Sequence, residues 1–568
     1  MTRSQRNHFS LVALYFCCGL SAGHAHGEQA VASAHPLATK AGVEILQNGG
    51  NAFDAAIAVS AVLAVVEPYS SGMGGGGFWL LYRARDQHTV MIDGRERAPL
   101  LATPALYLDA QGTLIPNASV DGPKSAAIPG TPAALVHLAR KYGRLPLSKT
   151  LNPAVQIARS GFAVTPLYQQ MAEFRLKALR TSPEAARIFL DQGQVPAVGT
   201  LIKQPELALT FEQLAQHGHV GFYGGSVAQK LVHEVRKAGG LWTQRDLTAY
   251  QVKERRPIVG RYKNLTITSV PPPSSGGVAL VTMLNILKQF NLEKQTPEMR
   301  VHLLTEAMRR AYRDRAQYLG DPDFIQVPVT RLTSQAHARR LAGNINLKKA
   351  TASSSLPQAV APRDSGRQTT HFSIIDQQGN RVAATLTINY AFGSAYVVPG
   401  TGVLLNDEMD DFVSKPGVPN LYGLTGGEAN AIAPGKRPLS SMTPTFIESH
   451  ERVALLGTPG GSRIITMVLL ALLEFEQGAS AKHLVQLPRF HHQYLPDQIQ
   501  FEPGALSPEL QNTLLRLGHA LKPLESTYGN MQVLLWNKRT GQIDAASDPR
   551  GIGTAEVAKQ TPRSAQGK

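Results

Sequence analysis

Two helical patterns follow one another near the start of the chain. Apolar residues recur at helical spacing through 38–46, and a second apolar run covers 55–66. The segment 48–51 (NGGN) separates them and predicts a break. The second run is too short to span a membrane, so it predicts a buried helix that ends at Glu67-Pro68.

A glycine-rich segment, 72–77 (GMGGGG), comes next and satisfies the pattern G-x-G-x-x-G. A dinucleotide site needs this pattern after a strand and before a helix, because the helix N-terminus holds the pyrophosphate. Here the helix comes first, and the strand-like residues 78–82 follow. The order favours a tight turn in which backbones approach closely.

The central part of the chain, 130–345, has a mostly helical pattern with short loops. Residues 349–368 are rich in Ala, Ser and Pro and have no hydrophobic period, which predicts a mobile linker. Alternation then begins abruptly at 372–375, passes through the turn-like segment 376–380 and continues over 381–388. This pattern predicts a β-hairpin.

The hairpin register suggests a site. If the turn is centred on Gln378, Thr369 lies opposite Thr387, with the two Cβ atoms about 5 Å apart. Asn389 would follow on the same face, because side chains alternate along a strand. Three polar residues would then share the mouth of the hairpin, although a slip of one residue would move them to the other face.

The composition is that of a globular protein able to bury a large core. The chain has 568 residues, of which 43% are hydrophobic and 17% are charged. This length suits two to four average domains or one large enzyme.

Residues 1–25 are typical of a secretory signal, with a basic start, a short apolar run and small residues around Ala25. The chain's two cysteines, Cys17 and Cys18, both lie inside it. A mature protein without thiols would have no disulfide and no cysteine nucleophile, so its nucleophile would be Ser, Thr or a carboxylate. A periplasmic or secreted location is expected.

The net charge of +16 raises the question of a nucleic-acid partner. The positive residues are spread along the chain, and their densest group, at 309–315, is interrupted by Asp314. The chain shows no alternation of aromatic and basic residues of the base-stacking kind. We therefore expect a solvated basic surface and no nucleic-acid partner. His491-His492 lacks the spacing of a metal site, so neither a metal nor another cofactor is expected.

The segment 368–373 (QTTHFS) resembles the processing site of γ-glutamyltranspeptidases, which are N-terminal-nucleophile hydrolases. The resemblance covers nearly all of the chain after the signal. Its further motifs, in order, are 35–39 (HPLAT), 49–56 (GGNAFDAA), 93–99 (DGRERAP), 271–277 (PPPSSGG), 318–322 (YLGDP), 405–412 (LNDEMDDF), 437–442 (RPLSSM), 458–463 (TPGGSR) and 488–492 (PRFHH).

The resemblance implies an α+β fold, a four-layer αββα sandwich formed by two subunits of one precursor. The large subunit would be 26–368 and the small subunit 369–568, and cleavage would follow Gln368. Thr369, then N-terminal, would be the nucleophile, and its α-amine would be the base. Thr387 resembles the hydroxyl partner of the nucleophile, and the N–H groups of Gly460 and Gly461 would form the oxyanion hole.

The implied donor is a γ-glutamyl compound such as glutathione. Arg95, with Ser440 and Ser441, resembles the group that holds the α-carboxylate. Asp411, Glu408 and Asn389 would accept hydrogen bonds from the α-ammonium. The segment 416–434, which includes Tyr422, resembles a lid that closes over the pocket in some members of the family.

The expected reaction is γ-glutamyl transfer to water, amino acids or short peptides through an ester on Thr369. One alternative is an acylase of the same fold that acts on glutaryl or poly-γ-glutamyl substrates. A glutaryl group has no ammonium, which leaves Asp411 and Glu408 without a purpose and disfavours this alternative. A second alternative is an uncleaved protein that only binds γ-glutamyl compounds; retention of Thr369 and Thr387 disfavours it.

Overall fold

The computed structural model of the chain describes residues 27–355, 368–415, 418, 420, 422–424 and 426–558. The expected signal sequence and residues 356–367 of the expected linker lie outside this part of the chain. Within the described ranges, no helix is long and apolar enough to cross a membrane.

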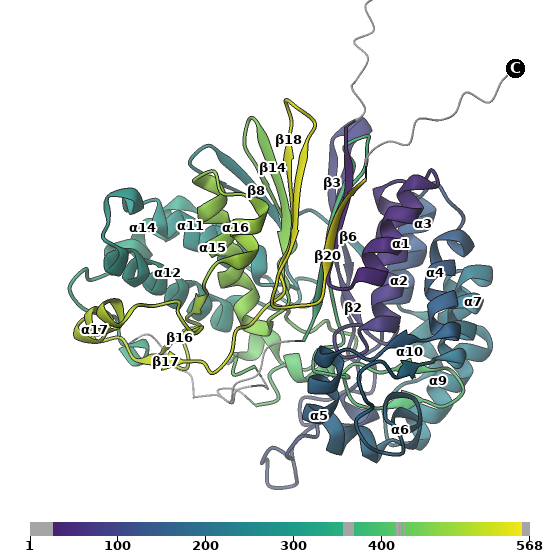
Figure 1. Cartoon of the computed structure of the whole chain (residues 1–568). Helices are drawn as coiled ribbons and strands as arrows, with labels where there is room; N and C mark the ends of the chain where they lie inside the picture. The colour runs from purple at the N-terminus through teal and green to yellow at the C-terminus, as the bar shows by residue number, and fades with distance from the viewer. Residues whose placement is uncertain are drawn as a thin grey trace, which may run out of the picture.

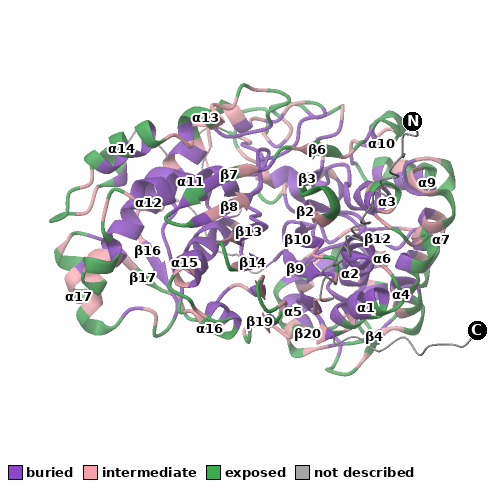
Figure 2. Cartoon of the chain, turned by 90° about the horizontal axis from the view of Figure 1, so that it is seen from above, coloured by how far each residue is buried: buried purple, intermediate pink, exposed green. Residues whose placement is uncertain are grey.

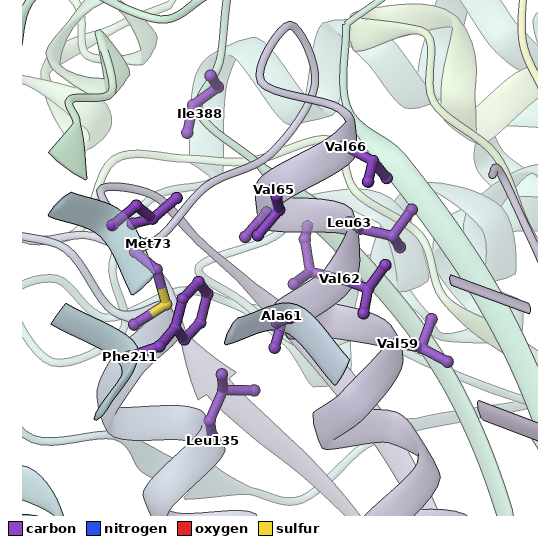
Figure 3. Close-up of a cluster of buried hydrophobic side chains, with 14 of the residues drawn as sticks. Val59, Ala61, Val62, Leu63, Val65, Val66, Met73, Leu135, Phe211 and Ile388 are labelled. Atoms are coloured by element: carbon purple, nitrogen blue, oxygen red, sulfur yellow. The ribbon is translucent and has the colours of Figure 1, made fainter. Parts of the chain in front are cut away.

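The first two helices form where the hydrophobic pattern predicts them. α1 (Pro36–Gln47) begins after His35, whose Nδ1 accepts a hydrogen bond from the N–H of Leu37 at 3.2 Å. α2 (Ala52–Val66) begins with a capping box between Asn51 and Asp54. Every residue of α2 is buried, as expected for a helix with apolar residues on all sides (Figure 3).

Two sheets lie at the centre of the molecule. One has seven strands with neighbouring strands antiparallel, and β9 and β10 lie near its middle. Its order is β20 (Thr554–Ala558), β1 (Gln29–Ser33), β9 (Thr370–Ile375), β10 (Arg381–Thr387), β2 (Gly76–Arg83), β3 (His88–Gly94) and β6 (Lys253–Arg255).

The second sheet has six antiparallel strands and packs face to face against the first. Its order is β19 (Ile543–Ser547), β18 (Gln532–Asn537), β14 (Arg452–Gly457), β13 (Thr445–Glu448), β8 (Leu265–Ser269) and β7 (Ile258–Tyr262). Apolar side chains from both sheets fill the layer between them, among them Phe78 and Leu80 from one sheet and Phe446 and Leu455 from the other.

Helices cover the two outer faces (Figure 1). The face of the seven-stranded sheet carries α1, α2, α3 (Thr131–Lys141), α4 (Leu147–Ser160), α5 (Pro166–Thr181), α6 (Pro183–Phe189), α7 (Pro205–His217), α8 (His219–Tyr223), α9 (Gly225–Lys237) and α10 (Gln244–Thr248). The face of the six-stranded sheet carries α11 (Gly276–Leu287), α12 (Pro297–Tyr318), α13 (Val329–Leu332), α14 (Gln335–Gly343), α15 (Ile464–Glu476), α16 (Ala481–Gln486) and α17 (Pro508–Arg516). The expected four-layer αββα sandwich is confirmed.

Short strands complete the structure. They are β4 (Phe162–Ala163) with β5 (Leu201–Ile202), β11 (Val397–Val398) with β12 (Val403–Leu404), and β15 (Phe490–His491) with β16 (Ile499–Phe501) and β17 (Leu521–Pro523). The buried residues gather in the two sheets and on the helix faces turned toward them (Figure 2).

The parts of the chain before and after Gln368 both contribute strands to each of the two sheets. In the seven-stranded sheet, β9 lies between β1 and β10, and β10 lies between β9 and β2. In the six-stranded sheet, β8 pairs with β13. The two parts therefore form one folded unit with a shared core.

The glycine segment 72–77 makes the expected close approaches. A Cβ added to Gly74 would lie 2.0 Å from the carbonyl oxygen of Leu404, and one added to Gly75 would lie 2.1 Å from that of Thr387. β2 begins at Gly76, directly after the turn. Helix–turn–strand is therefore the observed order, and the turn brings the chain against the end of β10.

The central region is mostly helical, as expected, and it also contributes β6, β7 and β8 to the two large sheets. Two expectations need correction. The expected linker does not begin at 349, because Ser353 is fully buried and its N–H donates to Asp497 at 2.7 Å. Ser-rich sequence gives no hydrophobic period, but its polar groups can still be fixed by buried charges.

The second correction concerns the basic group at 309–315. Arg309, Arg310 and Arg315 are buried, not solvated. Both Arg309 and Arg310 pair with Glu306 one turn away on α12, and Nε of Arg315 donates to Ser275 at 3.0 Å. Guanidinium groups can be buried when carboxylates and hydroxyls satisfy them, and these partners are not adjacent in the sequence.

The buried cap of α1 predicts an acid sensitivity. His35 is 6% exposed, and burial lowers its pKa to about 4, whereas an unfolded histidine titrates near 6.5. Below pH 6.5 the unfolded chain binds a proton that the folded chain does not, so the free energy of unfolding falls as the pH drops. Asn also caps helices well, so His35→Asn should keep the cap and lose this titration.

Between pH 7 and pH 5, the free energy of unfolding should fall by about 2 kcal/mol less in His35→Asn than in the unsubstituted chain. Urea unfolding would measure this in a Thr369→Ala background, which prevents the expected cleavage. His88→Asn, at an exposed histidine, is the matched control. Equal losses in all three proteins would contradict the assignment.

Candidate functional site

The predicted hairpin register is confirmed. Ile375 pairs with Arg381 and Thr370 with Leu386, which leaves Thr369 opposite Thr387 at the open end. The Thr369 hydroxyl donates to Oγ1 of Thr387 at 3.2 Å. The alternative register, one residue away, is therefore excluded.

Thr369 itself has an unusual backbone. Its φ is +120°, although threonine is β-branched and strongly disfavours positive φ. The side chain is only 6% exposed. Such a conformation costs on the order of 1–3 kcal/mol and has to be held by its surroundings.

Asn389 reaches the site by a different route from the one expected. β10 ends at Thr387, and Asn389 has a φ of +72°, so the chain has left the strand. Its N–H donates to Oγ1 of Thr387 at 2.8 Å, and its amide Nδ2 donates to the carbonyl of Asp407 at 3.1 Å. Asn389 therefore joins the threonine pair to the segment that carries Glu408.

Tyr422 connects the hairpin to the Gly460-Gly461 loop. Its hydroxyl donates to the carbonyl of Asn389 at 2.7 Å. Its ring lies against Gly461, because an added Cβ there would lie 2.6 Å from Cδ1 of the tyrosine. Gly460 and Gly461 both have positive φ, and nothing in the described part of the chain accepts a hydrogen bond from their N–H groups.

The second half of the site surrounds Arg95. This residue follows β3 and is fully buried, and its guanidinium forms ion pairs with Glu96, Glu408 and Asp411. Its Nε donates to the carbonyl of Pro438 at 3.1 Å, on the segment that leads to Ser440. One cation and three acidic side chains thus share a single pocket.

The titration of this pocket reflects its burial. Burial would lower the pKa of Arg95, but the carboxylates of Glu408, Asp411 and Glu96 outweigh it and raise the pKa. Burial raises the pKa of Glu96 to about 7 and that of Glu408 well above its usual range, against the opposing effect of Arg95. One oxygen of each of these two glutamates has no hydrogen-bond partner. The pocket therefore has acceptor oxygens free to receive donors.

The two halves are joined by Asn420, which donates to Asp411 at 3.3 Å and accepts from the N–H of Tyr422 at 3.0 Å. In the second half, Arg315 donates to Oγ of Ser441 at 3.3 Å. Ser440 accepts from the N–H of Met442 through its own Oγ at 3.1 Å. The contacts thus connect the threonine pair, Asn389 and Tyr422 with the pocket of Arg95.

Sequence reasoning missed three members of this site. Glu96 lies inside the motif 93–99, and only its neighbour Arg95 was assigned a role. Arg315 was included in the expected basic surface. Asn420 belongs to the expected lid, and its contact with Asp411 cannot be seen in any local pattern.

One group of possible metal ligands occurs within the described residues, and it lies outside this site. It consists of His302, Glu306 and His519. Both oxygens of Glu306 are engaged by Arg309, Arg310 and Thr351, and Nδ1 of His302 lies 2.8 Å from Nε2 of His519. The geometry of this group is that of a hydrogen-bonded core.

His491 and His492 use their rings separately. His491 bonds to Gln493 and Thr466 at 2.8 and 2.9 Å, and His492 bonds to Asp497 at 3.2 Å. The two imidazoles therefore do not converge on one point.

Known proteins of one family are similar to this chain over most of its length. A family model described as Gamma-glutamyltranspeptidase matches residues 38–558. A glutathione hydrolase proenzyme of Escherichia coli (strain K12) is 42% identical over 528 residues, which cover 92% of this chain and 90% of that protein. One from Bacillus subtilis (strain 168) is 36% identical over 545 residues, with coverages of 92% and 90%.

Solved structures agree with this placement. A cephalosporin acylase from Bacillus halodurans superposes with a TM-score of 0.83 at 27% identity, over 94% of this chain and 96% of that one. Helicobacter pylori gamma-glutamyltranspeptidase has a TM-score of 0.56 at 37% identity, over 57% of this chain and 94% of that one. The family model, the relatives and the fold agree, and the chain belongs to the γ-glutamyltranspeptidase family.

Proposed function

We propose that this chain is a self-cleaving γ-glutamyltransferase and glutathione hydrolase with Thr369 as its nucleophile. One observation carries the proposal: the hydrogen-bonded pair Thr369–Thr387 is joined through Asn389, Tyr422 and Asn420 to the charged pocket of Arg95. A nucleophile and a pocket with charges of both signs suit a donor that is itself a zwitterion.

Self-cleavage is the first reaction. The Thr369 hydroxyl attacks the carbonyl carbon of Gln368, and the C–N bond breaks as the hydroxyl proton passes to the Thr369 nitrogen. Water then hydrolyses the resulting ester, which leaves a carboxylate on Gln368 and a free α-amine on Thr369. The positive φ of Thr369 supports this step, since breaking the peptide bond releases a constrained backbone.

Donor binding uses the pocket around Arg95. The guanidinium suits the α-carboxylate of the γ-glutamyl group, because it can form two parallel hydrogen bonds, and the hydroxyls of Ser440 and Ser441 would add donors. The α-ammonium would be bound by Asp411 and Glu408, with Asn389 beside them. On binding, the α-carboxylate and the α-ammonium of the donor would replace the ion pairs that Arg95 makes with Glu408 and Asp411.

Transfer follows at the threonine pair. The Thr369 hydroxyl attacks the γ-carbonyl, and the free α-amine takes its proton and passes it to the departing amine. The N–H groups of Gly460 and Gly461 would bind the developing oxyanion, and Thr387 would orient the nucleophile. Water, an amino acid or a short peptide then accepts the γ-glutamyl group from the ester, with Tyr422 closing the pocket as part of a lid.

The proposed subunits would remain associated as a heterodimer, because their strands share both sheets. A periplasmic or secreted location is proposed from the pattern of residues 1–25.

An acylase remains the second candidate because of the cephalosporin acylase superposition. The sequence relatives favour the first candidate, since they are named glutathione hydrolase proenzymes and reach 42% identity. The acids around Arg95 also favour the first candidate. The carboxylate of a glutaryl group would pair with Arg95, and the group has no ammonium to pair with the acids in its place.

The cleavage site gives the first test. The purified wild type should contain a small subunit whose N-terminal residue is Thr369, and Thr369→Ala should remain a single polypeptide, because alanine has no hydroxyl to attack. Gel electrophoresis and N-terminal sequencing measure both. Thr370→Ser is the matched control and should cleave normally; a different N-terminus in the wild type would overturn the assignment.

The donor pocket gives the second test. Asp411→Asn should raise the KM for γ-glutamyl-p-nitroanilide between tenfold and about 150-fold, because a hydrogen bond to a charged group contributes about 1.5–3 kcal/mol. Asp410→Asn is the matched control, because the Asp410 carboxylate accepts from Ser119 at 2.7 Å and does not pair with Arg95. Equal turnover of the glutaryl and γ-glutamyl anilides by the wild type would favour the acylase.

The threonine pair gives the third test. Thr387→Val removes the hydroxyl that accepts from both Thr369 and the N–H of Asn389. It should lower kcat at least tenfold with little change in KM, because one lost hydrogen bond alone accounts for about tenfold. Thr387→Ser keeps the hydroxyl and should retain most of the activity. Full kcat in Thr387→Val, or a loss in Thr387→Ser alone, would mean that packing of the methyl group matters and the hydrogen bond does not.

A further inference from the structure

His371 fills a place that no role described above explains. It lies on β9, two residues after Thr369, and is fully buried. Side chains alternate along a strand, so its imidazole lies on the same face of the sheet as the Thr369 side chain. This face is turned toward the six-stranded sheet.

The imidazole fits against Gly457, the last residue of β14. A Cβ added to this glycine would lie 2.3 Å from Cε1 of His371 and 2.4 Å from its Nδ1. No side chain larger than hydrogen therefore fits beside the ring. Gly457 leads directly into the segment 458–461, which carries the proposed oxyanion donors Gly460 and Gly461.

The hydrogen bonds of the ring fix its tautomer. Ser373 donates its hydroxyl to the carbonyl of Gln532 at 3.3 Å, so it can accept from Nε2–H of His371, also at 3.3 Å. Nδ1 then accepts from the hydroxyl of Thr385 at 2.8 Å. Burial lowers the pKa of His371 to about 3, which agrees with a neutral ring.

These bonds connect the two sheets. Thr385 lies on β10 and pairs with His371 on β9, whereas Gln532 lies on β18 and pairs with Gly457 on β14. The hydrogen-bonded chain Thr385–His371–Ser373–Gln532 thus connects the two sheets across a layer that consists largely of apolar side chains. A second bond, from the N–H of Asn530 to Oγ1 of Thr458 at 3.1 Å, holds the loop near the same end of β18.

We propose that His371 is a positioning residue that sets the distance between Thr369 and the loop 458–461. The inference rests on the proposed function. The ring is fixed to β9 by hydrogen bonds and to the end of β14 by contact with Gly457. Thr369 lies directly before β9, and the oxyanion donors lie three and four residues after the end of β14, so the contact transmits the spacing of the sheets to the site. A misplacement of about 1 Å in such a site lowers the rate about a hundredfold.

A double-mutant cycle tests the contact. Gly457→Ala should lower kcat between tenfold and a hundredfold, because its Cβ displaces either the ring or the loop. The φ of Gly457 is not positive, so alanine suits the backbone itself. His371→Ala should lower kcat similarly, with KM changed less than about threefold. In the double variant, the smaller residue at 371 makes room for the new methyl group, so kcat should exceed that of Gly457→Ala at least threefold.

Controls separate positioning from stability. His519→Ala removes another buried, hydrogen-bonded histidine outside the site and should lower Tm without changing kcat. His371→Gln, which can still donate to Ser373, should recover part of the kcat lost in His371→Ala. If His371→Ala fails to fold, Gly457→Ala is compared with the double variant His371→Gln/Gly457→Ala. The double variant should have the higher kcat, because the flexible glutamine side chain can move away from the new methyl group.

Failure of the inference about His371 and failure of the proposed function give different results. If the losses of the two single variants multiply in the double variant, or if His371→Ala lowers only Tm, His371 is a core residue and the inference is wrong. If the wild type releases no chromophore from γ-glutamyl-p-nitroanilide, the proposed function falls. The same cycle, measured as the rate of self-cleavage of the full chain, then still decides the role of His371.

Discussion

The pairing of β9 with β10 is the interaction on which the rest of the site depends. It fixes which residues stand at the open end of the hairpin and directs the Thr369 hydroxyl to Thr387. A shift of one residue would exchange the two faces of the strand and turn the nucleophile toward the helices. Both strands are internal in the sheet, each paired on two sides, so the register is held from both directions.

The charged pocket shows how the same fold tolerates buried charge. A lone buried guanidinium would be very costly, and here three acidic groups surround it. Burial raises the pKa of Glu408 and Glu96 against the opposing effect of Arg95, and one oxygen of each has no hydrogen-bond partner. A bound ammonium group would donate to these oxygens and lower both pKa values, and the guanidinium suits a carboxylate, so the proposed pocket would select a zwitterionic end group.

Interleaving of the strands resolves an apparent difficulty of the proposed cleavage. The bond that would break lies beside an internal strand of a sheet, so the cut falls next to the core. Strands from both sides of Gln368 are interleaved in the seven-stranded sheet, and β8 pairs with β13 in the other. The hydrogen bonds and the apolar layer between the sheets therefore hold the two products together without the peptide bond.

The sequence by itself determined the local features of this protein. The periods of α1 and α2, the centre of the hairpin turn and the facing of Thr369 and Thr387 all follow from residues close together in the chain, where spacing alone sets geometry. The family motifs added the candidate residues of the pocket. The fold class followed from the resemblance, and the structure confirmed it.

Only the tertiary structure decided which polar groups are buried and what satisfies them. Arg309, Arg310 and Arg315 have the pattern of a basic surface, yet α12 turns them toward carboxylates and hydroxyls. The contact of His371 with Gly457 joins two residues far apart in the chain. A local pattern reports periodicity, whereas the burial of a charge and the fit of a ring depend on partners that only the packing of the two sheets and their helices brings together.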